Sequence, residues 1–275
     1  MLFLTKLAFK NLARHLNRTL ITASIIAFAI FFYILLDSLI GGMTGMAYQT
    51  IIDYETGHLQ VVNQEYWGKK EKIPLTDLFT FDQSIQKTLK QTRGYVSSSP
   101  ELNFQAQLSN GIDELPVIGK GIIPRAFTEV FALEDHLVEG KMPTLGKDQA
   151  VLGKRLADLL ELTTGDYITL QFRDKSETFN TIDAEIVGLV HTSNPNVNQN
   201  YVYLPMDRAQ QALNVGSQVS KVVVRLDHRD RAAATASSLA PEIQKVNQRL
   251  AVYAWDELEA VSFAAAQNVE NKIIL

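Results

Sequence analysis

The sequence contains no cysteine among its 275 residues. Disulfide bonds, thiolate metal sites and cysteine nucleophiles are therefore excluded, although an oxidising environment remains compatible because it permits disulfides without requiring them. The 26 basic residues (Lys and Arg) are outnumbered by 30 acidic residues (Asp and Glu), so the formal net charge is −4. Nucleic acid is for that reason not an expected partner, since binding phosphates requires a basic face.

Motifs that carry chemistry are missing as well. The sequence has no Walker-type phosphate loop, and Gly119-Lys-Gly121 lacks the spacing that wraps backbone amides around phosphates. It has neither the paired-histidine motif of zinc proteases nor the nucleophile elbow of serine hydrolases. The 5 histidines are scattered without ligand spacing: His15, His58, His136, His191 and His228. We therefore predict no catalytic residue, no metal site and no cofactor.

One long apolar run dominates the sequence. It covers residues 19–40 (TLITASIIAFAIFFYILLDSLI), and no charge occurs between Arg18 and Asp37. Roughly twenty apolar residues span the ~30 Å hydrocarbon core of a bilayer, where only a helix satisfies its own backbone. Asp37 would lie near one end, close to the headgroups. The run predicts a transmembrane helix over residues 19–40, and we expect Gly41, Gly42 and Gly45 to end or bend it.

Charge on either side of the run predicts its orientation. No lysine or arginine follows it until Lys69, whereas four basic residues precede it at intervals of four: Lys6, Lys10, Arg14 and Arg18. Basic residues next to a span stay cytoplasmic. Residues 1–18 are therefore expected to form a basic amphipathic segment in the cytoplasmic headgroup region, with the main domain outside. A cleaved signal peptide, a buried core helix and a simple tether remain alternatives.

The remaining residues have a globular composition with both strand and helix patterns. Alternating apolar residues predict strands over 57–62, 96–111, 117–123, 177–190 and 219–226, and helical patterns cover 77–90, 154–162 and 231–250. The fold class is therefore α+β. Between two strands, residues 191–200 (HTSNPNVNQN) form an expected polar loop and a candidate partner-binding tip, with five side chains offered to a partner: His191, Asn194, Asn196, Asn198 and Asn200.

Several segments resemble MacB/FtsX-type ABC transporter permeases. Residues 8–22 (AFKNLARHLNRTLIT) resemble the start of these permeases, and residues 55–62 (ETGHLQVV) resemble the strand after the first span in the lipoprotein-releasing (LolC/LolE-type) branch. The second subdomain of the periplasmic region is matched by five further segments: residues 138–143, 150–153, 159–170, 186–190 and 201–211. Each motif is loose, but their order covers nearly the whole chain.

The resemblance implies a domain plan. A cytoplasmic segment (1–18) and transmembrane helix 1 (19–40) would precede a periplasmic domain of two subdomains. One subdomain is discontinuous, over residues 46–130 and 217–256, and the other is inserted, over residues 131–216. Residues 257–275 would form a stalk and the beginning of transmembrane helix 2. The family has four such helices, so helices two to four and the contact with the ATPase are not expected within this sequence.

The resemblance also implies a function. Such permeases use ATP hydrolysis on a separate cytoplasmic ABC ATPase subunit to move their outer domains, a process called mechanotransmission. The implied partners are that ATPase, a second permease subunit (identical or paralogous), the lipid bilayer of the cell inner membrane, and lipoprotein cargo or a periplasmic carrier. A single-span membrane-anchored binding or sensor domain is the main alternative, and an anchored hydrolase is another.

Overall fold

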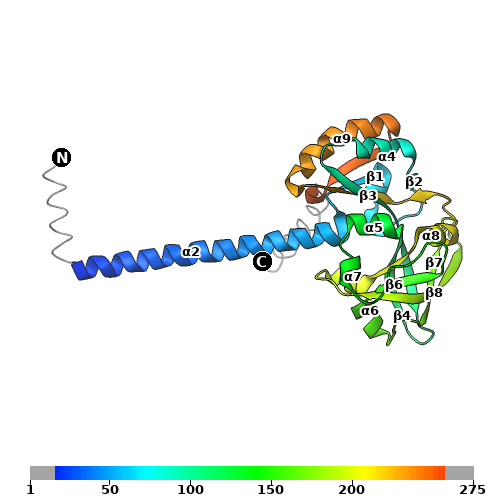
Figure 1. Cartoon of the computed structure of the whole chain (residues 1–275), viewed down its shortest axis with the longest axis horizontal. Helices are drawn as coiled ribbons and strands as arrows, with labels where there is room; N and C mark the ends of the chain where they lie inside the picture. Colours follow the sequence, from blue (N-terminus) through cyan, green and yellow to red (C-terminus); the bar gives the residue numbers. More distant parts are fainter. Residues whose placement is uncertain (1–15, 258–275) are drawn as a thin grey trace, which may run out of the picture. The chain divides into compact units, whose positions relative to one another are not determined.

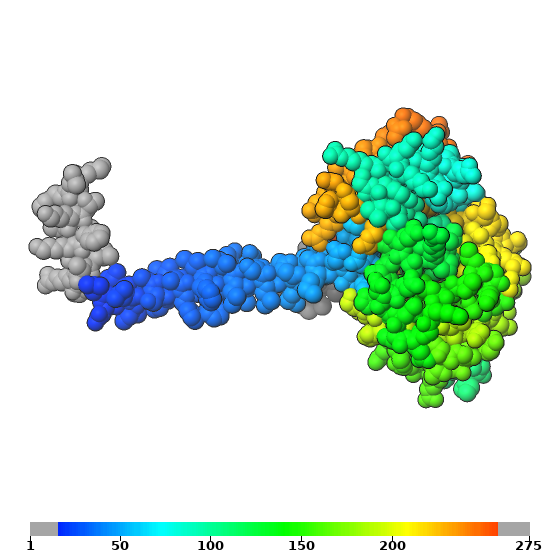
Figure 2. All heavy atoms as spheres, viewed as in Figure 1, coloured from blue at the N-terminus to red at the C-terminus, as the bar shows by residue number. Residues whose placement is uncertain are grey.

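The computed structural model describes residues 16–257, which divide into two compact units at Gln49 and Thr50. The described residues of the first unit, 16–49, all belong to helix α2 (Leu16–Ile51), and no side chain of this helix is buried. Figure 2 shows it as a column one helix wide. The helix is long and apolar enough to cross a membrane. Burial of each large apolar side chain would contribute ~1.5–3 kcal/mol relative to exposure to water.

The prediction that Gly41, Gly42 and Gly45 end or bend the helix was wrong, because α2 continues to Ile51. A glycine inside a helix costs only about 1 kcal/mol relative to alanine, and no proline interrupts this segment. The Thr44 hydroxyl also donates a hydrogen bond to the carbonyl of Ile40 (2.9 Å).

The second unit is a mixed α and β domain (Figure 1). Its helices are α3 (Gln64–Gly68), α4 (Gln83–Lys90), α5 (Pro124–Val130), α6 (Lys154–Leu159), α7 (Pro195–Asn200), α8 (Met206–Ala212) and α9 (Ala232–Val246). Its strands are β1 (Leu59–Asn63), β2 (Phe79–Thr80), β3 (Tyr95–Ser109), β4 (Glu114–Ile122), β5 (Leu137–Gly140), β6 (Gln149–Gly153), β7 (Tyr167–Arg173), β8 (Phe179–Val190), β9 (Tyr201–Pro205), β10 (Gln218–Val219), β11 (Lys221–Leu226) and β12 (Leu250–Ala254). The expected helix over 77–90 begins later, at Gln83, because Asp82 caps it there.

One large sheet organises this unit, with the strand order β12-β1-β11-β3-β4-β9-β6-β8-β5. Strand β7 pairs with both β3 and β8, so β3, β4, β9, β6, β8 and β7 form a closed ring of pairings. Strand β3 belongs both to this ring and to the part of the sheet that contains β11, β1 and β12. Its first part pairs with β11 and its last part pairs with β7.

Alternation along the strands separates two faces. The larger hydrophobic core lies on one face and includes Val61, Leu102 and Val224 together with Leu89 of α4 and Ile243 of α9. Figure 1 shows α4 and α9 side by side over that part of the sheet. A second cluster on the other face joins α5 to side chains of β4, β9 and β11. The predicted α+β fold class, with an apolar N-terminal helix before a sheet-rich domain, is confirmed.

Candidate functional site

Residues 52–58 connect the end of helix α2 to strand β1. A π-helical turn, Ile52–Thr56, follows the helix directly, and Gly57 N–H donates to the carbonyl of Ile52 (3.1 Å). Gly57 has φ +60°, and a Cβ at this position would lie 2.3 Å from Cγ1 of Val223. Glycine is therefore required by both the backbone conformation and the close approach of β11.

Side chains of this turn hold it against the sheet. Asp53 Oδ1 lies 3.0 Å from Arg225 Nη1, which also donates to the carbonyl of Val130 (2.8 Å). Ile52 and Tyr54 are buried, and Tyr54 belongs to the second hydrophobic cluster. The turn is thus fixed at once to β11, to the end of α5 and to the core.

Glu55 connects the π-helical turn to the segment between residues 193 and 201. Its Oε1 accepts hydrogen bonds from Asn196 Nδ2 (2.7 Å) and from the hydroxyl of Tyr201 (3.1 Å). The hydroxyl groups of Thr50 and Ser193 lie 3.3 Å apart. Helix α7 and strand β9 are therefore tied to the turn by polar contacts.

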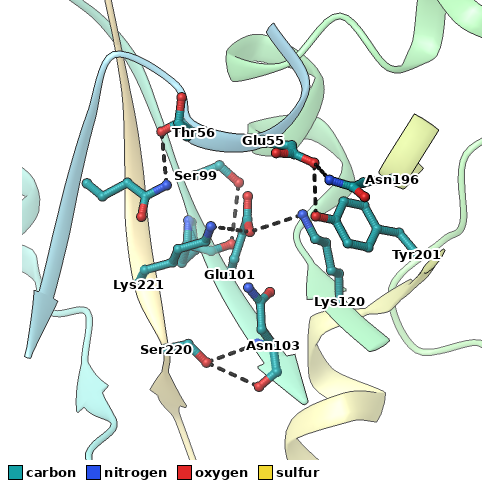
Figure 3. A network of polar contacts seen from close by, with 12 residues as sticks. Glu55, Thr56, Ser99, Glu101, Asn103, Lys120, Asn196, Tyr201, Ser220 and Lys221 are labelled. Carbon is teal, nitrogen blue, oxygen red and sulfur yellow. Dashed lines mark hydrogen bonds and ion pairs between the residues drawn. The ribbon is translucent and has the colours of Figure 1, made fainter. Parts of the chain in front are cut away.

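A buried ion network lies next to Glu55, on the same face of the sheet (Figure 3). Glu101 of β3 is fully buried, with Oε2 3.4 Å from Lys221 Nζ and 3.9 Å from Lys120 Nζ. Lys120 Nζ also lies 3.9 Å from the centre of the Tyr201 ring. Figure 3 shows the two lysines pointing toward Glu101 from opposite sides, with Glu55 and Tyr201 beside Lys120.

The charges of this network balance, since Glu55 and Glu101 oppose Lys120 and Lys221. Burial lowers the pKa of Lys120, and the nearby carboxylate of Glu101 opposes that shift. Both carboxylate oxygens of Glu101 lack a hydrogen-bond donor in the described structure, so the carboxylate is stabilised by the ion pairs of its Oε2 with Lys120 and Lys221. Removing one partner from such a buried group costs about 3–5 kcal/mol, which makes the network intolerant of rearrangement.

His58 sits where the turn joins the sheet. It is buried, and its Nδ1 accepts a hydrogen bond from the backbone N–H of Leu226 (3.2 Å). Burial, with a further contribution from the charge of Arg225, lowers the pKa of His58 to about 4. The imidazole is therefore neutral near pH 7 and acts as a structural acceptor between β1 and β11.

A cavity of about 240 Å³ adjoins the network and is lined by Glu55, Gln60, Asn103, Lys120 and Lys221 among others. No group of three histidine, aspartate or glutamate side chains that could hold a metal occurs within residues 16–257. The network connects Glu55 to strands β3, β4, β9 and β11 through hydrogen bonds, a cation–π contact and ion pairs. These contacts hold residues 52–56 against the sheet.

The residues proposed from the sequence have different outcomes. Lys6, Lys10 and Arg14 lie outside the described residues, whereas Arg18 lies in the first turns of α2. The prediction of a polar loop over 191–200 was wrong for its second half, because residues 195–200 form helix α7. Asn194 caps this helix through the N–H of Asn196, and Pro195 occupies its first turn.

Two of the five proposed partner residues are buried inside the domain. Asn194 and Asn198 are buried, and Asn198 Oδ1 accepts from the N–H of Thr192 (2.8 Å) while its Nδ2 donates to the Thr192 carbonyl (2.8 Å). His191, Asn196 and Asn200 are exposed, and Asn196 binds Glu55. A partner role for this segment stays a prediction.

The ion network was missed because its members are far apart in sequence. Polar residues occupy alternate positions of β3, namely Ser97, Ser99, Glu101, Asn103, Gln105 and Gln107. That alternation shows that one face of the strand is polar. It does not show which lysines meet Glu101.

Comparisons with known proteins place this fold. Residues 19–242 match the family described as MacB-like periplasmic core domain. The extracellular domain of the noncanonic ABC-type transporter YknZ from Gram-positive bacteria is similar, with 14% identity and a TM-score of 0.51, over 72% of this chain and 100% of that one. The periplasmic region of MacB from Actinobacillus actinomycetemcomitans has 15% identity and a TM-score of 0.53, over 80% of this chain and 96% of that one. At these identities the structural matches show the fold, and the family match covers most of the chain.

Proposed function

Because this chain belongs to the MacB-like periplasmic core domain family, which occurs in ABC-type transporter permeases, we propose that it works as a permease subunit by mechanotransmission. In this proposal ATP hydrolysis on a separate cytoplasmic subunit moves the outer domain through helix α2. The domain itself carries no reaction.

The observation that supports this role is the way in which the domain holds residues 52–56. The π-helical turn Ile52–Thr56 is buried on one side and clamped by the Asp53–Arg225 ion pair and by Glu55. A tether that only holds a domain near a membrane works equally well through a flexible linker. A segment that must transmit force has to be held firmly by the domain. Only Gly57 and His58 separate this turn from β1, and the His58 N–H donates a hydrogen bond to the carbonyl of Val224 (3.0 Å).

The membrane topology follows from charge. We infer that residues 1–18 lie in the cytoplasm, because Lys6, Lys10, Arg14 and Arg18 precede the span and basic flanks stay inside. Helix α2 then crosses the cell inner membrane, and residues from about 46 onward are extracytoplasmic. Residues 257–275 are proposed to lead into a second span.

Two subdomains are proposed within the outer domain, as expected from the sequence. Residues 131–216 supply β5, β6, β7, β8 and β9, which neighbour one another in the sheet order. Residues 46–130 and 217–256 supply the remaining strands, and β3 and β4 of this part carry the inserted strands. Movement of one part against the other would then bend β3 where it changes partners.

We further propose that the partners are an ABC ATPase subunit and a second permease subunit, identical or paralogous. Lipoprotein release, with cargo or a periplasmic carrier docking outside, is the branch that the sequence motifs favour. The exposed side chains of His191, Asn196 and Asn200 remain a candidate docking tip for such a partner.

A linker insertion tests the proposal. Full-length protein in nanodiscs is expected to capture an ABC ATPase encoded beside it, and nucleotide is expected to change the pattern of proteolysis of the outer domain. Inserting Gly-Ser-Gly-Ser between Ile51 and Ile52 should keep ATPase binding but abolish the nucleotide effect. The same insertion after Gly146, which is exposed in the β5–β6 connection, serves as the matched control.

Two results would overturn the proposal. If no ABC ATPase binds, a single-span anchored binding domain becomes the better description. If the insertion after Ile51 leaves the nucleotide effect intact, force does not pass through the turn.

A further inference from the structure

A second and larger cavity lies where strand β3 changes partners. Strand β11 pairs with β3 as far as Glu101, and β7 pairs with it from Gln107 onward. Between these points the sheet opens into a groove of about 690 Å³. Volumes of this size are typical of ligand sites, which favour the boundaries between structural parts.

Four residues that line the groove carry side-chain amides. Gln105 and Gln107 of β3, Gln171 of β7 and Asn200 are exposed, and Gln107 and Gln171 are direct neighbours in the strand register. Each primary amide offers both a donor and an acceptor, so these side chains match a ligand that alternates N–H and C=O groups.

Aliphatic residues line the groove beside the amides. Pro116 and Ile118 of β4 are the register partners of Gln107 and Gln105, and Ile73 lies in the segment before β2. Ile73 has φ +46°, an unusual conformation for a β-branched residue. Such a surface suits the alternate apolar side chains of an extended polypeptide segment.

One end of the groove carries an exposed aromatic residue. Phe179 is 74% exposed, and the guanidinium of Arg173 covers its ring at 4.0 Å. The connection between these residues is held by hydrogen bonds from the N–H groups of Ser176 and Thr178 to Asp174 Oδ1. Arginine and aromatic side chains are enriched where proteins bind one another.

Charges around the groove nearly cancel. Lys72, Arg173 and Lys175 are offset by Asp174 and Glu177. A strongly acidic or basic ligand would therefore gain little from this surface. The complementary ligand is uncharged along its length.

We propose that this groove binds an extended, uncharged polypeptide segment of a partner protein. The main chain of the segment pairs with the amides of Gln105, Gln107 and Gln171. Its apolar side chains pack on Ile73 and Ile118. At ~3.3 Å per residue, four to six extended residues follow β3 across the opening.

Fluorescence anisotropy of labelled heptapeptides tests this site. The probes alternate Thr or Ser with Val or Leu, and matched peptides carry Lys or Glu at the polar positions. Full-length protein in nanodiscs is expected to bind the uncharged peptides and not the charged ones. The double variant Gln105→Ala/Gln107→Ala should weaken binding about tenfold, since each amide contributes a net hydrogen bond.

Two variants complete the design. Gln83→Ala/Gln244→Ala removes two exposed glutamines from α4 and α9 and should leave peptide binding unchanged. Gln107→Trp should abolish binding by filling the groove, and its melting temperature shows whether the domain remains folded. Three results would each overturn the proposal. These are peptide binding that neither groove variant weakens, binding of neutral oligosaccharides alone, and no peptide binding at millimolar concentration.

Discussion

Replacing Glu101 by glutamine removes a buried negative charge while preserving the size of the side chain. Glu101 is fully buried, and its Oε2 lies 3.4 Å from Lys221 Nζ and 3.9 Å from Lys120 Nζ. In the variant two ammonium groups would face each other without a carboxylate. We therefore expect the free energy of unfolding to fall by about 3–5 kcal/mol, the range for removing one partner of a buried ion pair.

That loss is a large share of the ~5–15 kcal/mol that stabilises a natural domain. In a domain of this size each 1 kcal/mol shifts the melting temperature by about 2–4 °C, so Glu101→Gln should lower it by roughly 6–20 °C. Trp67 reports the change, because it lines the adjoining cavity and stacks on Tyr253 at 4.1 Å. Urea unfolding followed by tryptophan fluorescence gives the free energy.

A matched control uses an exposed ion pair. Glu242 and Lys245 lie on the surface of α9, and Glu242→Gln should cost no more than ~0.5 kcal/mol. Replacing Glu101, Lys120 and Lys221 together by methionine should recover most of the stability, because no charge is then left unpaired. If Glu101→Gln costs no more than Glu242→Gln, water reaches the network and the reasoning fails.

Three further predictions concern residues 52–58. Gly57→Ala should lower the free energy of unfolding by about 2–4 kcal/mol in urea titrations, since φ is +60° and the new Cβ meets β11; a neutral result would show that the turn relaxes. Because the folded pKa of His58 is about 4 against 6.5 unfolded, the stability that it contributes is complete above pH 6.5 and is lost as pH falls toward 4. Between pH 7 and pH 5 the loss should be about 2 kcal/mol, and His58→Asn, which keeps an acceptor for Leu226 N–H, should abolish that pH dependence; an unchanged profile would contradict the assignment. Asp53→Asn should cost about 1–2 kcal/mol, and a double-mutant cycle with Arg225→Gln should show coupling, whereas additivity would mean that the pair is not formed.

The apolar helix and the α+β class could be predicted because their signals are local. The length of an apolar run can be counted directly in the sequence. Alternation of residues, as in 219–226, indicates a strand with one buried and one exposed face. The end of the helix could not be predicted. Whether Gly41 to Gly45 break it depends on what surrounds the helix, and the π-helical turn depends on contacts with Arg225, which is far away in the chain.

The site was less predictable than the fold for the same reason. Asn194 before Pro195 is a readable helix start, yet the segment was interpreted as a loop because six helical residues give almost no periodicity. The burial of Asn198 depends on Thr192 and on the packing of the domain. Glu101 and Lys120 become neighbours only once β3 pairs with β4, a consequence of topology that single-sequence patterns do not contain.

The most direct test of ATP-driven motion is a distance measurement across the assembled transporter. A spin label at Ser237→Cys, on the exposed face of α9 in this cysteine-free chain, would be paired with a label on the second permease subunit. We predict that trapping the ATPase with nucleotide shifts the distance distribution measured by pulsed electron paramagnetic resonance by several ångströms. An identical distribution in both states, while the complex hydrolyses ATP, would contradict mechanotransmission through this domain.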